Sequence, residues 1–218
     1  MNLEKTTLEN LRQEYSARSL SEKDVNSDPF RQFELWFNEA MQSGILEPNA
    51  LTLSTATSLG KPSARVVLLK GFSDEGFTFF TNYNSRKGHE LRQNPFACIS
   101  FFWLELQRQI IIEGVIEKVS LDESTRYYQT RPKGSQLGAW VSEQSTVIAD
   151  REVLENKLAE LENQYANQEV LPKPEYWGGY LLKPSSIEFW QGRPSRLHDR
   201  IQYILEADGN WKIQRLAP

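Results

Sequence analysis

Two short stretches of the chain set cations beside apolar, strand-like residues. The second, at positions 196–200, reads Arg-Leu-His-Asp-Arg. The first is formed by Arg65, Val66, Val67, Leu68, Leu69 and Lys70. A buried cation is costly unless an opposite charge faces it, and both the planar fork of arginine and the point charge of lysine suit phosphate. The two stretches therefore predict sites for a phosphate-bearing ligand.

On a regular strand, Arg65 and Lys70 have opposite parity, so they would serve two different anions unless a bulge realigns them. A further anion site is indicated where residues 81–87, Thr-Asn-Tyr-Asn-Ser-Arg-Lys, lead from a strand into a helix. Free backbone N–H groups at a helix start favour phosphate, and Arg86 and Lys87 add positive charge there.

Tyr127, Arg131 and Ser135 are spaced four residues apart, which would place them on one face of a helix. Pro132 and Gly134 argue against one continuous helix, so we expect a helix end followed by a turn. A guanidinium and two hydroxyls still make a good phosphate cage.

Two glutamines, Gln109 and Gln144, offer both a donor and an acceptor, as the edge of a flavin or a pyrimidine-like ring requires. Near the C-terminus, Arg196, His198 and Arg200 alternate, so a strand would present all three on one face. Neither the histidines nor the cysteine show metal-ligand spacing, and no metal site is expected. The sequence also lacks a Gly-x-Ser-x-Gly elbow and a Gly-x-Gly-x-x-Gly fingerprint, which argues against a serine hydrolase and a Rossmann site.

The bulk composition indicates a globular protein. Of 218 residues, 39% are hydrophobic and 25% are charged, and the net charge is -4. An acidic chain has no general basic field for nucleic acid or anionic lipid. A single cysteine, Cys98, excludes a disulfide within the chain, and no apolar run is long enough to span a membrane. We therefore expect a cytoplasmic protein without nucleic-acid or membrane partners.

The hydrophobic periodicity predicts a mainly β protein with helices, of the α+β class, as one domain at residues 21–218 behind a mobile arm at residues 1–20. Helices are expected from a cap at Ser27 or Asp28 to Gly44, and at residues 86–93, 120–130 and 151–167. Strands are expected at 51–55, 65–70, 77–81, 96–103, 108–119, 179–183, 186–190, 200–206 and 211–216. Short strands joined mostly by hairpins favour a closed or nearly closed antiparallel barrel over a doubly wound parallel sheet.

Taken together, these motifs closely resemble the pyridoxamine 5′-phosphate oxidase family over nearly the whole chain. The most specific pieces are residues 65–70, 85–87, 131–142, 189–192 and 196–200. The resemblance implies an FMN-binding split β-barrel, antiparallel and Greek-key-like, that forms a homodimer with FMN at the subunit interface.

The resemblance also implies roles for individual residues. Arg196 and His198 would be catalytic, holding the reacting carbon of the substrate against the flavin. The flavin would be bound by Arg65, Val66, Val67, Leu68, Leu69, Lys70, Phe80, Thr81, Arg86, Lys87, Gln109, Gln144, Ser145, Trp190 and Arg200. The substrate would be bound by Arg12, Gln13, Glu14, Tyr15, Lys70, Tyr127, Arg131, Ser135, Arg196, Leu197 and His198.

The implied reaction is the FMN-dependent oxidation of pyridoxamine or pyridoxine 5′-phosphate by dioxygen. The products would be pyridoxal 5′-phosphate and hydrogen peroxide, with ammonia from the amine. Two features depart from the family pattern: Phe80 stands where tyrosine is common, and the loop at residues 192–195, Gly-Arg-Pro-Ser, carries an extra cation and a proline. The first would remove one hydrogen bond, and the second would alter how the site closes.

Three other readings compete with this one. Another split-barrel flavoprotein, such as a flavin reductase or a haem-degrading relative, would share the flavin site but lack the cage of Lys70, Tyr127, Arg131 and Ser135. A non-catalytic carrier of pyridoxal phosphate would keep the phosphate sites without turnover. A nucleic-acid-binding barrel is disfavoured by the acidic charge.

Overall fold

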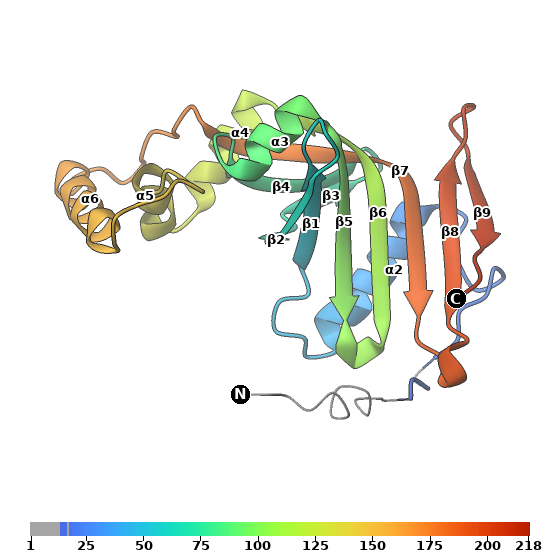
Figure 1. Cartoon of the computed structure of the whole chain (residues 1–218). Helices are drawn as coiled ribbons and strands as arrows, with labels where there is room; N and C mark the ends of the chain where they lie inside the picture. The colour runs from blue at the N-terminus through green and yellow to red at the C-terminus, as the bar shows by residue number, and fades with distance from the viewer. Residues whose placement is uncertain (1–13, 17) are drawn as a thin grey trace, which may run out of the picture. The chain divides into compact units, whose positions relative to one another are not determined.

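The computed structural model describes residues 14–16 and 18–218, which fall into two compact units. Unit 1 contains the described residues up to 48 together with residues 100–112 and 186–218, and unit 2 contains residues 49–99 and 113–185. Three strands have residues in both units: β5 (Phe96–Trp103), β6 (Arg108–Lys118) and β7 (Trp177–Gln191), which are labelled in Figure 1. Arg12 and Gln13 of the predicted arm lie outside the described residues.

Unit 2 is built on antiparallel strands. β1 (Ala50–Ala56) pairs with β2 (Pro62–Leu68), which sets Leu53 opposite Arg65. β3 (Gly71–Ser73) pairs with β4 (Gly76–Asn82), and β4 pairs in turn with β7. The strand order is β2-β1-β5-β6-β7-β4-β3. Helix α3 (Arg86–Gln93) follows β4 and begins at Ser85, whose side chain accepts a hydrogen bond from the Gly88 N–H group.

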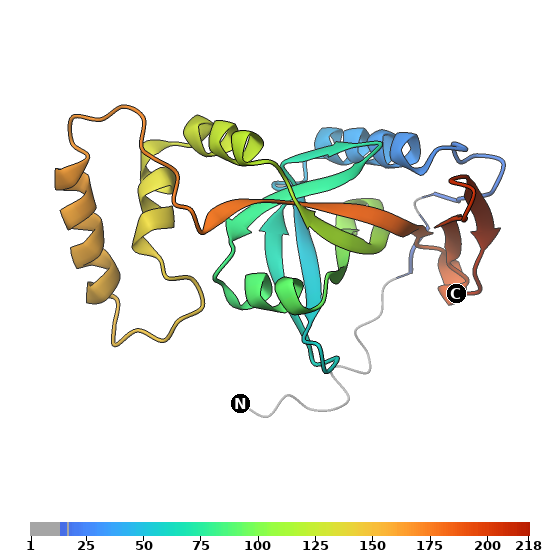
Figure 2. The ribbon, with the colours of Figure 1, turned by 90° about the horizontal axis from the view of Figure 1, so that it is seen from above.

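Three more helices of unit 2 join β6 to β7. α4 (Leu121–Thr130) is capped by Ser120, whose side chain accepts from the Glu123 N–H group. α5 (Lys133–Val141) and α6 (Glu152–Gln164) lie side by side (Figure 2). The predicted helix end before Pro132 is confirmed, because α4 ends at Thr130, but a new helix begins directly after Pro132 where only a turn was expected. Proline serves here as the N-cap residue with a φ of -53°, where no backbone donor is needed.

In unit 1, helix α2 (Pro29–Gln42) packs in a core rich in aromatic residues, and Asp28 caps its N-terminus. Phe33 and Phe101 are in contact, and Trp36 meets the ring of Phe189 edge-on, with 5.1 Å between centroids. β8 (Asp199–Leu205) pairs with both β7 and β9 (Trp211–Arg215). Short 3-10 turns occur at Leu104–Leu106 and Pro194–Arg196.

The predicted fold class, an antiparallel and mainly β architecture with helices, is confirmed. The strand bounds differ from expectation most at β2 and β7. β2 ends at Leu68, so Lys70 lies in the link to β3 rather than on the strand. β7 is one strand and not two, because Pro184 continues an extended chain whose backbone lies close to Gly114 of β6. Among the described residues, no helix is both long and apolar enough to cross a membrane.

Candidate functional site

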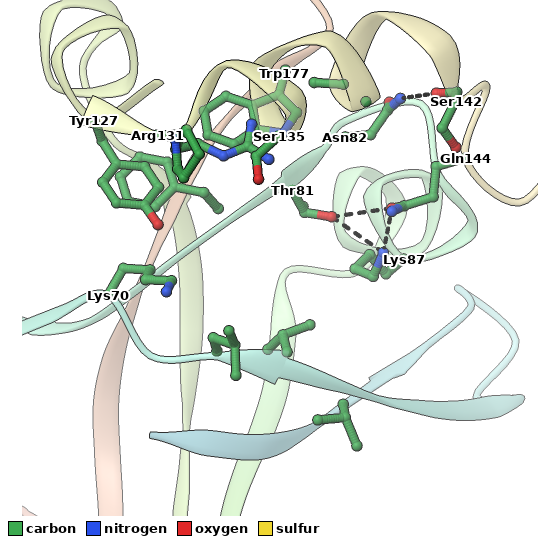
Figure 3. Close-up of a pocket in the computed structure, with 17 residues that line it drawn as sticks. Lys70, Thr81, Asn82, Lys87, Tyr127, Arg131, Ser135, Ser142, Gln144 and Trp177 are labelled. Carbon is green, nitrogen blue, oxygen red and sulfur yellow. Dashed lines mark hydrogen bonds between the residues drawn. The ribbon is translucent and has the colours of Figure 1, made fainter. Parts of the chain in front are cut away.

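Unit 2 contains a cavity of about 570 Å³. Its wall comes from β2, the β2–β3 link, β4, the first turn of α3, α4, α5, the segment after α5 and the start of β7 (Figure 3). The lining residues are Val66, Val67, Leu68, Lys70, Phe80, Thr81, Asn82, Lys87, Tyr127, Arg131, Pro132, Ser135, Gly138, Ala139, Ser142, Gln144 and Trp177.

One side of the cavity gathers the four residues predicted to form a phosphate cage. Lys70 is held by its backbone, whose N–H group donates to the Thr78 carbonyl at 2.8 Å. Tyr127 lies on α4, Arg131 ends that helix, and Ser135 occupies the first turn of α5 (Figure 3). The α4–α5 junction therefore brings the guanidinium and the two hydroxyls to the same side of the cavity that Lys70 reaches.

Arg131 is held from two directions. Its guanidinium stacks over the ring of Trp177 at 4.6 Å, and its carbonyl accepts a hydrogen bond of 2.8 Å from the side chain of the buried Gln136. The guanidinium atom Nη1 is buried without a hydrogen-bond partner among the described residues. A buried unpaired donor is costly, so this atom indicates that an acceptor belongs beside it.

Aromatic rings form the wall beside this cage. Phe80 stacks on Tyr127 with ring centroids 4.0 Å apart and on Trp177 with centroids 5.6 Å apart. Tyr127 and Trp177 are nearly parallel, at an interplanar angle of 9°. Phe80 thus supplies a flat apolar surface without a hydroxyl group, and this surface fixes the ring of Tyr127.

The other side of the cavity contains a buried lysine. The Nζ atom of Lys87 lies 2.7 Å from the Gln144 side-chain oxygen and 3.2 Å from the Thr81 hydroxyl (Figure 3). A third partner is the Ser85 hydroxyl at 3.3 Å. Burial, together with the charge of Arg65, lowers the pKa of Lys87 to about 8. This ammonium is therefore held by neutral dipoles, and an anion would stabilise its charged form.

A cationic cluster lies around the same helix start. It consists of Arg65 on β2, Arg86 and Lys87 on α3, and the carboxylate of Glu90, which is paired with both arginines. Three positive charges against one negative charge leave two in excess. Arg65 and Arg86 are not among the residues that line the cavity, and neither are Leu69 and Ser145.

Unit 1 holds the remaining predicted residues of the described chain. The ring of His198 lies 4.6 Å from that of Trp190, and Tyr15 approaches both rings at about 6 Å. The Nδ1 atom of His198 accepts a hydrogen bond from the Arg193 backbone at 3.1 Å. When the imidazole is neutral, its proton therefore resides on Nε2.

The loop before β8 has unusual backbone geometry. Ser195 and Arg196 adopt positive φ angles of 56° and 61°, a conformation that side chains other than glycine rarely adopt and that tends to occur at functional sites. Arg196 and Leu197 are exposed. Arg200 pairs with both carboxylate oxygens of Glu188, at 2.8 and 2.9 Å. Gln109 is half-buried on β6, and Glu14 is exposed.

The structure thus divides the predicted site residues into two sets, one in each unit. Several residues of the cavity wall were not given a binding role from the sequence, although most lie in or beside the motifs at 81–87 and 131–142: Asn82, Pro132, Gly138, Ala139, Ser142 and Trp177. Trp177, directly before Gly178-Gly179, carried the clearest available signal, because small residues beside a large aromatic ring indicate close backbone approach. Glu90 was also missed, although it stands one helical turn after Arg86.

Comparison with protein families gives two matches. A family model described as pyridoxamine 5′-phosphate oxidase covers residues 37–165. A second, described as the C-terminal dimerisation region of pyridoxine 5′-phosphate oxidase, covers residues 177–218.

Relatives at high identity carry a related name. A pyridoxine/pyridoxamine 5′-phosphate oxidase from Cupriavidus metallidurans is 57% identical over 98% of this chain and 100% of its own length. One from Trichormus variabilis is 55% identical over 97% and 99%.

Among solved structures, PhzG from Burkholderia lata, in complex with tetrahydrophenazine-1-carboxylic acid, matches with a TM-score of 0.86 at 33% identity, covering 93% of this chain and 100% of that one. A pyridoxamine 5′-phosphate oxidase-related, FMN-binding protein from Nostoc punctiforme matches with a TM-score of 0.68 at 19% identity, covering 92% and 100%. The latter likeness concerns the fold alone.

Proposed function

We propose that this chain, which belongs to the pyridoxamine 5′-phosphate oxidase family, is an FMN-dependent oxidase. It converts pyridoxine 5′-phosphate and dioxygen into pyridoxal 5′-phosphate and hydrogen peroxide. Pyridoxamine 5′-phosphate reacts with dioxygen and water to give the same two products and ammonia.

The observation that carries this proposal is the unpaired, buried Nη1 atom of Arg131 in a cavity that Lys70, Tyr127 and Ser135 share. These four side chains offer a guanidinium, an ammonium and two hydroxyl groups, which together suit the several oxygens of a phosphate monoester. The flat wall of Phe80 and Trp177 beside them suits an aromatic ring on the same molecule.

The residues also fit FMN. Its phosphate is a dianion near neutral pH, and the cationic cluster of Arg65, Arg86, Lys87 and Glu90 carries two positive charges in excess. Gln144, already in contact with Lys87, offers an amide to the polar edge of a flavin ring. Held by these residues, FMN would supply the redox chemistry, as the hydride acceptor for the substrate and the electron donor to dioxygen.

The side chains of this protein bind and orient the reactants. Lys70, Tyr127, Arg131 and Ser135 hold the substrate phosphate, which fixes the exocyclic carbon at a set distance from that anchor. Arg196 and His198 cover the pyridine ring, with the Nε2 proton of His198 available as a donor. Tyr15, whose ring lies about 6 Å from those of Trp190 and His198, closes over the substrate and excludes water.

We further propose that the protein is a homodimer with FMN at the interface, because residues 177–218 match a region described by its role in dimerisation. In such a dimer, the unit 2 set of one protomer and the unit 1 set of its partner complete one site. Gln109, Trp190 and Arg200 would then reach the flavin from the partner's side.

A product assay tests the proposed reaction. Purified protein with added FMN, in air, is expected to form hydrogen peroxide and pyridoxal 5′-phosphate from pyridoxamine 5′-phosphate, and to be far less active on pyridoxamine. The PhzG structure contains a tricyclic carboxylate, so a tetrahydrophenazine carboxylate is the informative competitor. Turnover of that compound without turnover of the phosphate would overturn the proposal.

A further inference from the structure

Glu90 is a buried carboxylate that contacts groups from three elements. Its side chain is on α3, and the residue is 4% exposed. Its Oε2 atom accepts hydrogen bonds of 2.5 Å from the hydroxyls of Thr55 on β1 and Ser63 on β2. Burial would raise the pKa of Glu90, but hydrogen bonds from Ser63, Thr55 and Arg86 lower it to about 2. The group is therefore an anion at any working pH.

The same carboxylate joins two arginines that come from different elements. Its Oε1 atom accepts from Nε of Arg86 at 2.9 Å, and Oε2 lies 3.4 Å from Nη2 of Arg65. Arg65 is pinned further, because its Nη1 atom donates to the Leu53 carbonyl and to the Thr55 hydroxyl. Its Nη2 atom donates to the Ser63 hydroxyl.

Without Glu90, two guanidinium groups and the nearby Lys87 ammonium would repel one another with no opposing charge. Arg65 would keep its bonds to Leu53, Thr55 and Ser63. Arg86 would lose the ion pair that orients it, and binding an anion would then have to select one of its rotamers. Holding charged donors in their bound arrangement beforehand lowers the entropic cost of binding. The negative charge of Glu90 therefore repels a bound phosphate, but its hydrogen bonds hold the arginine donors in the orientation that the phosphate needs.

We propose that Glu90 is a positioning residue that fixes Arg65 and Arg86 for the phosphate group of the flavin. This inference rests on the proposed function, in which that cluster binds FMN. Glu90 does not itself contact the flavin in this proposal, so its effect should be confined to the phosphate and absent for the ring system.

Comparing two flavins separates this role from a general structural one. Flavin-free full-length protein is titrated with FMN and with riboflavin, which lacks the phosphate, and binding is followed by flavin fluorescence. Glu90→Gln keeps the shape, and its amide can still bond the two hydroxyls because a hydroxyl can donate or accept. We expect the FMN preference, the ratio of the riboflavin Kd to the FMN Kd, to fall roughly tenfold.

Glu155→Gln is the matched control, because Glu155 forms the same i,i+4 pair with Arg151 at 2.6 Å but on the exposed surface of α6. Its FMN preference should equal that of the wild type. If Glu90→Gln does not fold, Thr55→Val removes one anchor of both Glu90 and Arg65 while keeping all charges, and should lower the same ratio.

Three results would overturn the inference. Equal loss of affinity for both flavins would show a structural role, and tighter FMN binding would show that the charge of Glu90 outweighs its geometry. An unchanged ratio would show no role. Each of these leaves the proposed function intact, whereas a wild-type protein that binds neither flavin removes both.

Discussion

At the residue scale, Arg131 provides the most specific contact of the proposed substrate site. Its Nη1 atom is buried and unpaired, while stacking on Trp177 fixes the guanidinium plane. Arg131→Gln removes the charge and should raise the KM for pyridoxamine 5′-phosphate about 30- to 100-fold, which corresponds to about 2–3 kcal/mol for a charged hydrogen bond. Steady-state kinetics at saturating FMN measure this effect.

Arg126→Gln is the appropriate comparison, because Arg126 is exposed on the same helix and does not line the main cavity. Its KM should remain that of the wild type. An Arg131 variant with an unchanged KM would remove Arg131 from the substrate site.

Lys87 gives the site a pH dependence. Burial, aided by the charge of Arg65, lowers its pKa to about 8, so the ammonium loses its proton above that pH. FMN phosphate favours the charged form, and the FMN Kd should therefore rise about tenfold between pH 7 and pH 9. Titrations of the wild type and of Lys87→Met check this prediction. A wild-type Kd that is flat with pH, or a step that survives in the variant, would contradict it.

Lys87 should also lower the free energy of unfolding of the flavin-free protein. Because the folded-state pKa of Lys87 lies below the value of 10.5 usual for lysine, the free energy of unfolding of the flavin-free protein includes a penalty below pH 8. That penalty fades between pH 8 and about 10.5. Lys87→Met should therefore raise the Tm at pH 7 by about 2–4 °C for each kcal/mol relieved, while weakening FMN binding. A lower Tm for the variant would contradict this account.

Residue types and spacing predicted much of the cavity wall, since Lys70, Tyr127, Arg131 and Ser135 come together as their chemistry suggested. They could not predict the roles of Trp177 and Glu90. Those roles depend on contacts with residues far away in sequence, which local residue types and spacing do not reveal. The strand expected to carry Lys70 is also shorter than its apolar run suggested, because β2 ends at Leu68, two residues before Lys70.

At the element scale, the start of α3 is fixed by close packing. A Cβ atom on Gly88 would lie 2.1 Å from the Tyr83 carbonyl oxygen, so α3 can approach the preceding turn only with glycine at this position. Gly88→Ala should lower the free energy of unfolding by about 2–4 kcal/mol and should weaken FMN binding, because Arg86 and Lys87 move with the helix. Thermal denaturation and FMN titration give both quantities.

Gly134→Ala in α5 is the control, because a Cβ atom at this position would not clash as it would at Gly88. No atom lies within 4 Å of a Cβ added there, and alanine favours helix by up to about 1 kcal/mol over glycine. We expect equal or greater stability for this variant. A Gly88 variant as stable as the wild type would show that the packing at α3 is adaptable.

Most helices and strands followed from periodicity and capping residues, as with Asp28 before α2 and Ser85 before α3. The two elements that differ most from the prediction, α5 and β7, both contain or follow a proline. Pro132 precedes a helix and Pro184 lies within a strand. Proline is tolerated at both kinds of position when the fold does not require a backbone N–H hydrogen bond there. The local sequence does not show whether such a hydrogen bond is required, because the requirement depends on which backbone segment lies beside the proline.

At the scale of the whole molecule, the predicted site residues fall into two sets in different units. If a dimer completes each site from both protomers, two impaired variants should complement each other when they are assayed at a substrate concentration far below the KM of Arg131→Gln. Arg131→Gln affects the unit 2 set and Arg196→Ala the unit 1 set. In an equal mixture of exchanged protomers, half of the dimers are mixed and each has one intact site, so about a quarter of wild-type activity should return.

Each variant alone, exchanged with itself, serves as the control and should keep its low activity at that substrate concentration. If each site is built within a single protomer, a mixed dimer contains two damaged sites. Activity that does not rise above the controls would therefore contradict a shared site.

The central claim is that this protein couples oxidation of a phosphorylated pyridine amine to reduction of bound FMN. The most direct measurement is the visible spectrum of the FMN-loaded protein when pyridoxamine 5′-phosphate is added without oxygen. The account predicts that the flavin absorbance bleaches and that the colour returns when air is admitted. A yellow protein whose spectrum does not change on addition of the substrate would contradict it.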